Sequence, residues 1–228
     1  MARADLDKII IMLTHNDVTV QDAYQVFDSC KDLPIRHWGF KNVGLEYDKV
    51  KELAGYMKQQ GKVTTLEVVT YTEDSCLEGA KMAVDCGFDS LCGTIPYEST
   101  IRYAQEYKLQ YYPFVGEVSG SPSVLKGAVE KFLEQEEWLS KMGVQGTDLL
   151  LYRYADGDPE EFARKYLPKA KLRTILAGSV SSPERIRTVL GFGAEGFTMG
   201  SALFTKNFVK EGSFRENLEE VIRIIEAV

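Results

Sequence analysis

The chain alternates between short apolar segments and amphipathic segments, and this alternation limits its fold more than any other feature. The apolar segments are rich in β-branched residues, as buried parallel strands are. The segments between them carry apolar residues at helical spacing, and Gly61, Gly87 and Gly191 close three of them. Eight such pairs fill the 228 residues with short connections. The pattern predicts an eight-stranded parallel (β/α)8 barrel, the TIM barrel, formed by residues 1–228 as one domain.

Each expected element can be placed by residue number. The expected strands are residues 8–13, 34–41, 62–70, 89–92, 110–115, 148–152, 172–177 and 196–199. The expected helices are residues 20–30 with Thr19 as cap, 45–60, 72–86, 97–107, 123–142, 159–166 with Asp158 as cap, a helix opened by Ser182-Pro183, a short helix 202–206, and 214–227 with Ser213 as cap. The Gly- and Ser-rich loop 116–122 has the composition of a flexible lid.

Composition and charge narrow the function classes. The net charge of −7 argues against sequence-independent nucleic-acid binding, which needs a basic face. We expect a cytoplasmic protein without a membrane partner, because the N-terminus lacks a signal-peptide pattern and no apolar run approaches the roughly 20 residues that span a bilayer. Four cysteines without a CxxC pair, and only two histidines, predict reduced thiols, no metal site and no cofactor. The aromatic residues near the strand ends fit either a sugar face or an interface, which leaves a homo-oligomer open.

Residues 172–206 carry the clearest functional pattern. Two consecutive expected strands end in the same dipeptide, Gly178-Ser179 and Gly200-Ser201. Glycine lets backbone N–H groups approach an anion, and the short helix 202–206 would point its N-terminus at the same place. In (β/α)8 barrels the loops after strands 7 and 8 commonly hold a phosphate. We therefore predict that Gly178, Ser179, Gly200 and Ser201 bind phosphate; ordinary strand-end turns are the alternative.

The same segment resembles the end of the ribulose-phosphate-binding barrel superfamily. The pattern is a strand ending in Gly-Gly or Gly-Ser, a Ser/Thr-Pro-Glu helix start, Gly-Ala, and a strand ending in Gly-Ser-Ala. It stands here as Gly178-Ser179, Ser182-Pro183-Glu184, Gly193-Ala194 and Gly200-Ser201-Ala202. The resemblance covers only this part of the chain. It implies a barrel that binds a small phosphorylated sugar or sugar acid. It leaves the reaction open, because the group contains isomerases, epimerases and decarboxylases.

Lys41 and Glu67 are the first candidates for catalysis, because catalytic groups of such barrels come from the C-terminal ends of strands. Lys41 ends the second strand; it could bind an anion, transfer a proton or form a Schiff base, with a solvated loop lysine as the alternative. Glu67 lies inside an apolar strand and could be an acid/base or the salt partner of Lys41. The N-acetylmannosamine-6-phosphate epimerases of the superfamily carry a catalytic lysine where Lys41 stands. Their acid after strand 7 has no counterpart in Gly178-Ser179-Val180, so that activity is not carried over.

Five further polar residues follow expected strands. Glu117 is a second candidate acid/base or a solvated loop residue, and Arg153 suits a carboxylate or a second phosphate, or else a salt bridge at the rim. His15 could shuttle protons near neutral pH, and Asn16 is a candidate ligand-binding residue. Asp17, next along, fits a cap or a turn and ranks below Lys41 and Glu67.

Three functions fit these residues. The first is a cofactor-free phosphosugar isomerase or epimerase that transfers a proton next to a carbonyl. The second is a Schiff-base aldolase or lyase with Lys41 as the nucleophile. The third is a barrel that binds a phosphometabolite and regulates a partner without catalysis.

Overall fold

A computed structural model describes residues 5–228 and has the expected barrel architecture. Eight strands form one parallel sheet in the order β10-β11-β12-β1-β4-β5-β6-β7. Their bounds are β1 Ile9–Met12, β4 His37–Lys41, β5 Val63–Val68, β6 Ser90–Gly93, β7 Gln110–Tyr112, β10 Gly146–Leu149, β11 Arg173–Leu176 and β12 Gly196–Met199. β12 pairs with β1, with Ile10 beside Thr198. The last strand of the chain is therefore a neighbour of the first strand in the sheet.

The barrel closes between β7 and β10 just beyond the end of β7. Phe114 forms a parallel bridge with Asp148. Asp148 N–H donates to Pro113 O at 2.8 Å, and Val115 N–H donates to Asp148 O at 3.3 Å. Towards the N-terminal ends of the same two strands the seam opens into a cleft of about 280 Å³, lined by residues that include Gln110, Tyr112 and Arg173. The closure therefore lies at the end of the barrel that carries the site.

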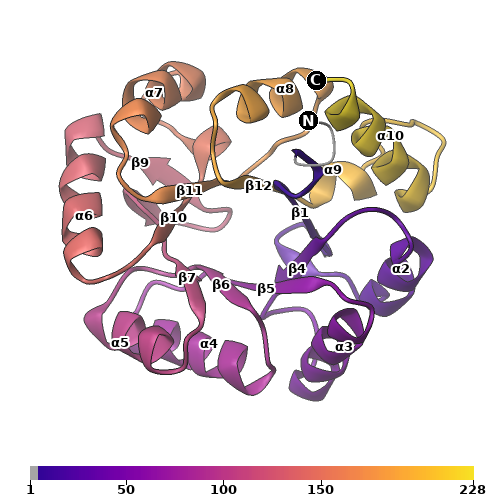
Figure 1. Ribbon diagram of the computed structural model, residues 1–228, viewed down its shortest axis with the longest axis horizontal. Helices are drawn as coiled ribbons and strands as arrows, with labels where there is room; N and C mark the ends of the chain where they lie inside the picture. The colour runs from indigo at the N-terminus through magenta and orange to yellow at the C-terminus, as the bar shows by residue number, and fades with distance from the viewer. Residues whose placement is uncertain (1–4) are drawn as a thin grey trace.

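Helices surround the strands on all sides (Figure 1). They are α2 Ala23–Cys30, α3 Tyr47–Gln59, α4 Glu73–Asp85, α5 Glu98–Glu106, α6 Val129–Lys141, α7 Pro159–Tyr166, α8 Pro183–Gly191, the short α9 Ser201–Phe204, and α10 Phe214–Glu226. The expected caps of the last helices are confirmed: Asp158, Ser182 and Ser213 each accept a hydrogen bond from the first turn. Thr19 is not the cap of α2; it lies on β3 (Val18–Thr19), and its hydroxyl donates to Lys41 O at 2.8 Å.

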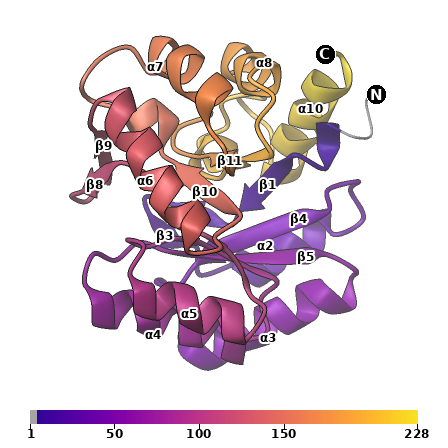
Figure 2. The ribbon, with the colours of Figure 1, turned by 60° about the vertical axis from the view of Figure 1, so that its left-hand side comes forward.

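The segment between β7 and α6 differs from the expectation. Residues 116–122 do not form an open loop, and the helix begins at Val129 rather than at residue 123. The segment instead forms an antiparallel hairpin, β8 (Glu117–Ser119) and β9 (Val124–Lys126). Figure 2 shows it beside α6. Val118 and Leu125 pair across it and are both buried, so the hairpin is held by tertiary packing.

The end of the sixth barrel strand also differs from the expectation. The strand stops at Leu149, and Leu151–Arg153 form a turn of 3₁₀-helix. Leu125 bridges to Tyr154 just beyond this turn, and Ala155 N–H donates to Leu125 O at 2.9 Å. The chain therefore leaves the barrel wall early to meet β9, which directs Arg153 over the barrel mouth.

Two groups of buried side chains fill the molecule. The large apolar core lies between strands and helices and includes Trp38, Phe40 and Phe132. A smaller cluster fills the inside of the barrel: Ile10, Met12, Cys92, Tyr112 and Ile175. The polar residues Lys41 and Asp148 are also buried at this level of the strands. Polar and apolar side chains therefore share the barrel interior near the end that carries the site.

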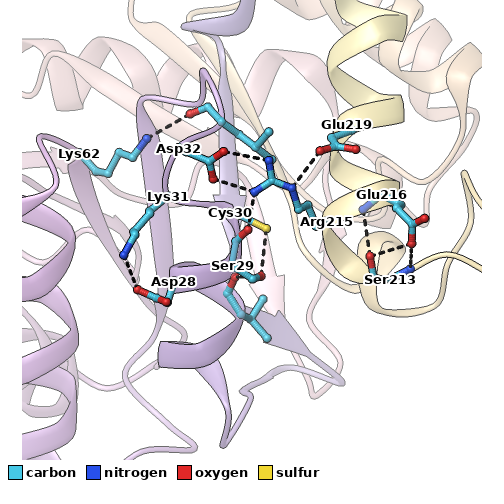
Figure 3. A network of polar contacts seen from close by, with 12 residues as sticks. Asp28, Ser29, Cys30, Lys31, Asp32, Lys62, Ser213, Arg215, Glu216 and Glu219 are labelled. Carbon is cyan, nitrogen blue, oxygen red and sulfur yellow. Dashed lines mark hydrogen bonds and ion pairs between the residues drawn. The ribbon is translucent and has the colours of Figure 1, made fainter.

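A polar network joins α10 to the C-terminal end of α2 and to Asp32 just after it (Figure 3). Arg215 of α10 donates to both carboxylate oxygens of Asp32, at 2.6 and 2.9 Å, and to Glu219 on its own helix at 2.9 Å. It also donates to the backbone carbonyl of Ser29 in α2 at 2.5 Å. A bidentate guanidinium–carboxylate pair of this kind fixes the orientation of the two helices more than a single ion pair would.

Other expectations concern membranes and cysteines. Within residues 5–228, no helix is both long and apolar enough to cross a membrane. Cys30, Cys76, Cys86 and Cys92 are all free and buried, as expected.

Candidate functional site

A cavity of about 230 Å³ opens at the C-terminal ends of the strands, where (β/α)8 enzymes place their catalytic groups. Its walls come from strands on both halves of the barrel and from the loops after β11 and β12. The lining includes Asp17, Lys41, Glu67, Arg153, Gly178, Ser179, Gly200 and Ser201. The structure thus brings together seven of the predicted site residues in one cavity. The larger cleft at the opposite end of the barrel lies where such folds keep residues for stability.

The turn after β11 is held in an unusual backbone conformation. Gly178 and Ser179 both have positive φ angles, 81° and 60°. Arg185 of α8 donates to Ser179 O at 2.6 Å, and its guanidinium lies over the Tyr152 ring at 4.2 Å from the centroid. The contacts of Arg185 therefore hold the backbone of the turn. The exposed Ser179 lines the cavity.

The turn after β12 is fixed by close packing. A Cβ atom on Gly200 would lie 2.8 Å from Thr14 O and 3.0 Å from Met12 O, so only glycine fits against the end of β1. The hydrogen bonds of the following short helix start at Leu203 N–H, which donates to Gly200 O at 2.9 Å. The N–H groups of Ser201 and Ala202 come before this bond in the chain, so no carbonyl of the helix accepts a hydrogen bond from them.

The two turns are joined to each other beside the cavity. Asn207, which follows α9, donates to Ser181 O at 3.1 Å, and Thr205 donates to Asn207 Oδ1 at 2.8 Å. Asn207, Thr205 and Ser181 all line the cavity. This rim combines backbone N–H groups, hydroxyls and an amide, which are groups that hydrogen-bond to phosphate oxygens.

Lys41 and Glu67 lie on the opposite wall. Their strands run side by side in register, Lys41 next to Glu67, and their charged groups approach to 3.5 Å. Lys41 Nζ also lies 3.0 Å from Asp17 Oδ1. The Lys41 side chain is only 8% exposed, whereas that of Asp17 is 30% exposed. The lysine is therefore a buried cation held between two carboxylates that both reach the cavity.

Asp17 reaches Lys41 because of a two-residue hairpin. β2 (Thr14–His15) pairs with β3, and the connecting residues Asn16 and Asp17 both have positive φ angles, as tight hairpin turns require. Arg153 Nη2 donates to Asp17 Oδ1 at 3.2 Å, so Asp17 bridges the two cations of the site. The expected place of Asp17 in a turn is confirmed, and the structure shows that this turn residue also lines the cavity.

The charge state of Lys41 follows from these neighbours. Burial lowers the pKa of Lys41, but the Glu67 and Asp17 carboxylates outweigh burial and hold that pKa above its ordinary value. Lys41 is therefore an ammonium ion at neutral pH. A Schiff-base nucleophile must be a free amine, so this environment favours proton transfer or charge stabilisation over the aldolase alternative.

Asp17 should make stability sensitive to acid. Burial raises its pKa, but hydrogen bonds and charge from Lys41 and Arg153 outweigh burial and lower the pKa overall. A lowered folded-state pKa gives stability that is present above the unfolded value of about 3.9 and is lost as pH falls through the folded value. Urea unfolding of Asp17→Asn between about pH 6 and pH 3 should therefore show a smaller loss of stability than the wild type. The exposed Asp7→Asn is the control, and equal slopes for Asp17→Asn and wild type would contradict the prediction.

Three predicted residues lie away from this cavity. Glu117 is exposed on β8 opposite Lys126. His15 is half-buried beside the Phe204 ring, with 5.7 Å between ring centroids. Asn16 is exposed and faces a shallower hollow next to Arg153 and Tyr154. The structure does not bring Glu117 or His15 to Lys41 and Glu67, so the geometry gives no support to their predicted catalytic roles. The hollow beside Asn16 shares Asp17, Ser179 and Ser201 with the cavity, so binding of a ligand by Asn16 stays a prediction.

One buried acid at this end of the barrel was not singled out from the sequence. Asp148 on β10 is 1% exposed, and its Oδ1 has no hydrogen-bond partner within the described residues. Burial and the Glu67 carboxylate raise its pKa, although Lys41 and the Gly93 backbone act in the other direction. The signal was available, because Asp148 precedes three leucines as an acid inside an apolar strand, which is the argument that picked out Glu67.

Comparison with known proteins supports the fold. Orotidine 5'-phosphate decarboxylase from Pyrococcus horikoshii OT3 superposes with a TM-score of 0.69 at 12% identity, covering 96% of this chain and 100% of that one. The tryptophan synthase alpha chain from Legionella pneumophila subsp. pneumophila gives 0.66 at 11% identity, covering 100% and 98%. The N-acetylmannosamine-6-phosphate 2-epimerase from Clostridium perfringens gives 0.64 at 12% identity, covering 90% and 94%. The likeness to these solved barrels confirms the expected (β/α)8 fold. At these identities it is a likeness of fold, and it extends over nearly the whole chain.

Searches by sequence add nothing to this likeness. The chain matches no protein-family model, and no curated protein sequence matches it. The solved barrels include a decarboxylase, an epimerase, aldolases and a synthase, so they leave the reaction of this chain open. The residues of the cavity are therefore the basis for a proposed reaction.

Proposed function

We propose that the chain is a cofactor-free enzyme that isomerises or epimerises a small phosphorylated sugar or sugar acid. The observation that carries the proposal is the placement of Lys41 between two carboxylates on one wall of a cavity whose other wall is the pair of Gly-Ser turns. A cavity of about 230 Å³ suits a small metabolite. A phosphate at the turns would place the carbon chain of the ligand across the barrel mouth, towards Lys41.

The side chains can then divide a proton transfer between them. Glu67 takes the proton from the carbon next to the carbonyl, and the electron pair moves onto the carbonyl oxygen. The Lys41 ammonium stabilises that oxygen, as a fixed positive charge in a partly dry site does best. Asp17 keeps the ammonium in place and charged, and Arg153 orients Asp17. Return of the proton to the other face of the same carbon re-forms the carbonyl and gives epimerisation. Return of the proton to the former carbonyl carbon gives isomerisation, provided that the hydroxyl proton of the adjacent carbon passes to the enolate oxygen and the new carbonyl forms at that adjacent carbon.

Thermal unfolding with paired ligands tests the binding half of the proposal. Sugar phosphates and phosphorylated sugar acids should raise the unfolding midpoint, and the same compounds without phosphate should not. A ligand at 100 times its dissociation constant adds about 2.7 kcal/mol to the free energy of unfolding. If no phosphorylated compound shifts the midpoint, or if the phosphate makes no difference, the proposed phosphate site is wrong.

Exchange of carbon-bound hydrogen tests the catalytic half. The ligand with the largest shift is incubated with the protein in D2O, and incorporation of deuterium next to its carbonyl is followed by NMR. Incorporation supports proton transfer. Binding without any incorporation would indicate instead a barrel that binds a phosphometabolite without catalysis. A covalent adduct on Lys41 after borohydride treatment would indicate the lyase chemistry.

A further inference from the structure

The cleft between β7 and β10 lies apart from the cavity that carries the proposed reaction. It has a volume of about 280 Å³ and shares no lining residue with that cavity. The two strands are the ends of the eight-stranded sheet, and they meet only at the bridge between Phe114 and Asp148. Towards the N-terminal ends of these strands, the backbone that would pair across the seam borders the cleft instead.

The β7 wall of the cleft has backbone groups that face β10. Gln110 N–H donates to Asp89 O at 3.3 Å, so the backbone groups of Gln110 face β6. In a strand, the N–H and C=O groups of successive residues point to opposite edges, so those of Tyr111 and Pro113 face β10. Pro113 O accepts a hydrogen bond from Asp148 N–H at 2.8 Å, which agrees with this alternation.

The β10 wall of the cleft is unpaired at Gly146. Arg173 N–H donates to Gln145 O at 3.2 Å, so Gln145 faces β11 and Gly146 faces β7. Continuation of the pairing would need a hydrogen bond from residue 113 to Gly146 O, but Pro113 has no N–H. Within the described residues 5–228, no backbone hydrogen bond joins Tyr111 to Gly146. Each wall therefore offers the cleft one N–H donor and one C=O acceptor.

The charged side chains around the cleft are positive. Among the described residues, Lys108 and Arg173 line it and no aspartate or glutamate does, although the net charge of the chain is −7. Arg173 already donates to Glu195 at 2.9 Å, and its guanidinium lies over the Tyr112 ring at 5.9 Å from the centroid. Lys108 is exposed and forms no ion pair with any residue in the part of the chain that the structure describes. The cleft thus has a cation that is available to a ligand.

We propose that this cleft is a second binding site, which takes a small carboxylate with a secondary amide, such as an N-acylated amino acid. In a trans amide the N–H and C=O groups point in opposite directions, so one amide can donate to one wall and accept from the other. The carboxylate of the ligand pairs with Lys108. The inner side of the cleft is the Tyr112 ring, which packs so closely on Gly146 that an added Cβ would lie 2.4 Å from it. That ring offers an apolar surface to the acyl group.

Titration of the nitrogen-15-labelled full chain with N-acetylglycine tests the site. The amide resonances of Tyr111 and Gly146 should move, and those of Ser201 and Ala202 at the barrel mouth should not. N-acetylsarcosine keeps the carboxylate without the amide N–H, and acetate has no amide. Each should bind at least about tenfold more weakly, because a backbone group of the cleft then stays unpaired. Absence of binding, equal affinities for the three compounds, or movement only outside the cleft would each overturn the proposal.

Backbone hydrogen exchange tests the unpaired walls in the free protein. Gly146 N–H should exchange faster than Asp148 N–H, which donates to Pro113 O at 2.8 Å. N-acetylglycine should slow the exchange of Gly146 and leave that of Asp148 unchanged. Equally slow exchange of both groups in the free protein would show that the seam is closed and would contradict the proposal.

Replacement of Lys108 with glutamine tests the charge of the ligand. Lys108→Gln should weaken the binding of N-acetylglycine about fivefold, the upper range for an exposed ion pair, without a change in the unfolding midpoint. Lys131→Gln is the matched control, because Lys131 is also exposed but lies on α6 outside the cleft. Wild-type affinity in Lys108→Gln would overturn the proposed ligand class. The outcome is independent of the proposed reaction, because phosphorylated ligands are tested at the other end of the barrel.

Discussion

Replacement of Lys41 with methionine is expected to lower the rate of hydrogen exchange at the ligand carbon by roughly 10²- to 10³-fold, the range for loss of a group that stabilises a developing oxyanion. Methionine keeps most of the length of the side chain but removes the ammonium that lies 3.0 Å from Asp17 and 3.5 Å from Glu67. The two Gly-Ser turns, at Gly178-Ser179 and Gly200-Ser201, follow other strands and keep their geometry. A phosphorylated ligand should therefore still bind, so the loss should appear in kcat more than in affinity.

The Lys41→Met variant should also be less stable near neutral pH. It leaves Asp17 and Glu67 without their shared cation, and removal of one partner of a buried ion pair typically costs about 3–5 kcal/mol. Because both carboxylates reach the cavity and water, we expect a value below that range. Activity is therefore compared well below the unfolding midpoint of the variant. Lys126→Met, at an exposed lysine on β9, is the control and should behave as wild type; full activity of Lys41→Met would exclude the proposed mechanism.

Replacement of Gly200 with alanine is expected to abolish binding of the phosphorylated ligand. The added Cβ would lie 2.8 Å from Thr14 O and 3.0 Å from Met12 O, and both are backbone atoms that cannot rotate away. The turn must therefore move, and with it the N–H groups of Ser201 and Ala202. Overpacking of this kind typically costs about 1–3 kcal/mol in stability, which leaves a folded protein to measure.

The control for Gly200→Ala is Gly191→Ala. Gly191 is the last residue of α8, and an added Cβ there would meet no atom within 4 Å. Alanine at Gly191 should leave ligand binding unchanged and slightly raise the free energy of unfolding, because alanine favours helix more than glycine does. Isothermal titration with the phosphorylated ligand separates the two variants. Wild-type affinity in Gly200→Ala would show that the turn after β12 does not hold the phosphate.

The predicted bounds of helices and strands were accurate where residues next to the element in the sequence begin and end it. The helix expected at residues 159–166 and the strand expected at 196–199 have the observed bounds. Both are set by neighbours in sequence: Asp158 and Pro159 start the helix, and Gly196 and Gly200 bracket the strand. The same kind of signal placed the Gly-Ser turns at one edge of the sheet, because parallel strands end at a common edge.

The prediction for residues 116–128 is wrong because their structure depends on distant partners, whereas the helix that follows forms as expected from Val129. A loop rich in Gly and Ser has no local preference for a hairpin. β8 and β9 form because Val118 and Leu125 find buried places, and because Tyr71 donates to Gly120 O at 2.8 Å across the barrel mouth. Such contacts join segments far apart in sequence, so no reading of the loop alone could have found them.

The sequence pattern was sufficient to predict the barrel. Eight apolar strands that alternate with eight amphipathic helices can bury their apolar faces against one another in few other ways. The sequence also determined the Gly-Ser turns and the strand-end positions of Lys41 and Glu67. Which charged groups lie in contact depends on the tertiary structure. Asp17 and Arg153 are 136 positions apart in the sequence, yet Arg153 Nη2 lies 3.2 Å from Asp17 Oδ1. The tertiary structure also separated Glu117 and His15 from the cavity and buried Asp148 beneath it. Charges act through space, and sequence fixes their distances only through the completed fold.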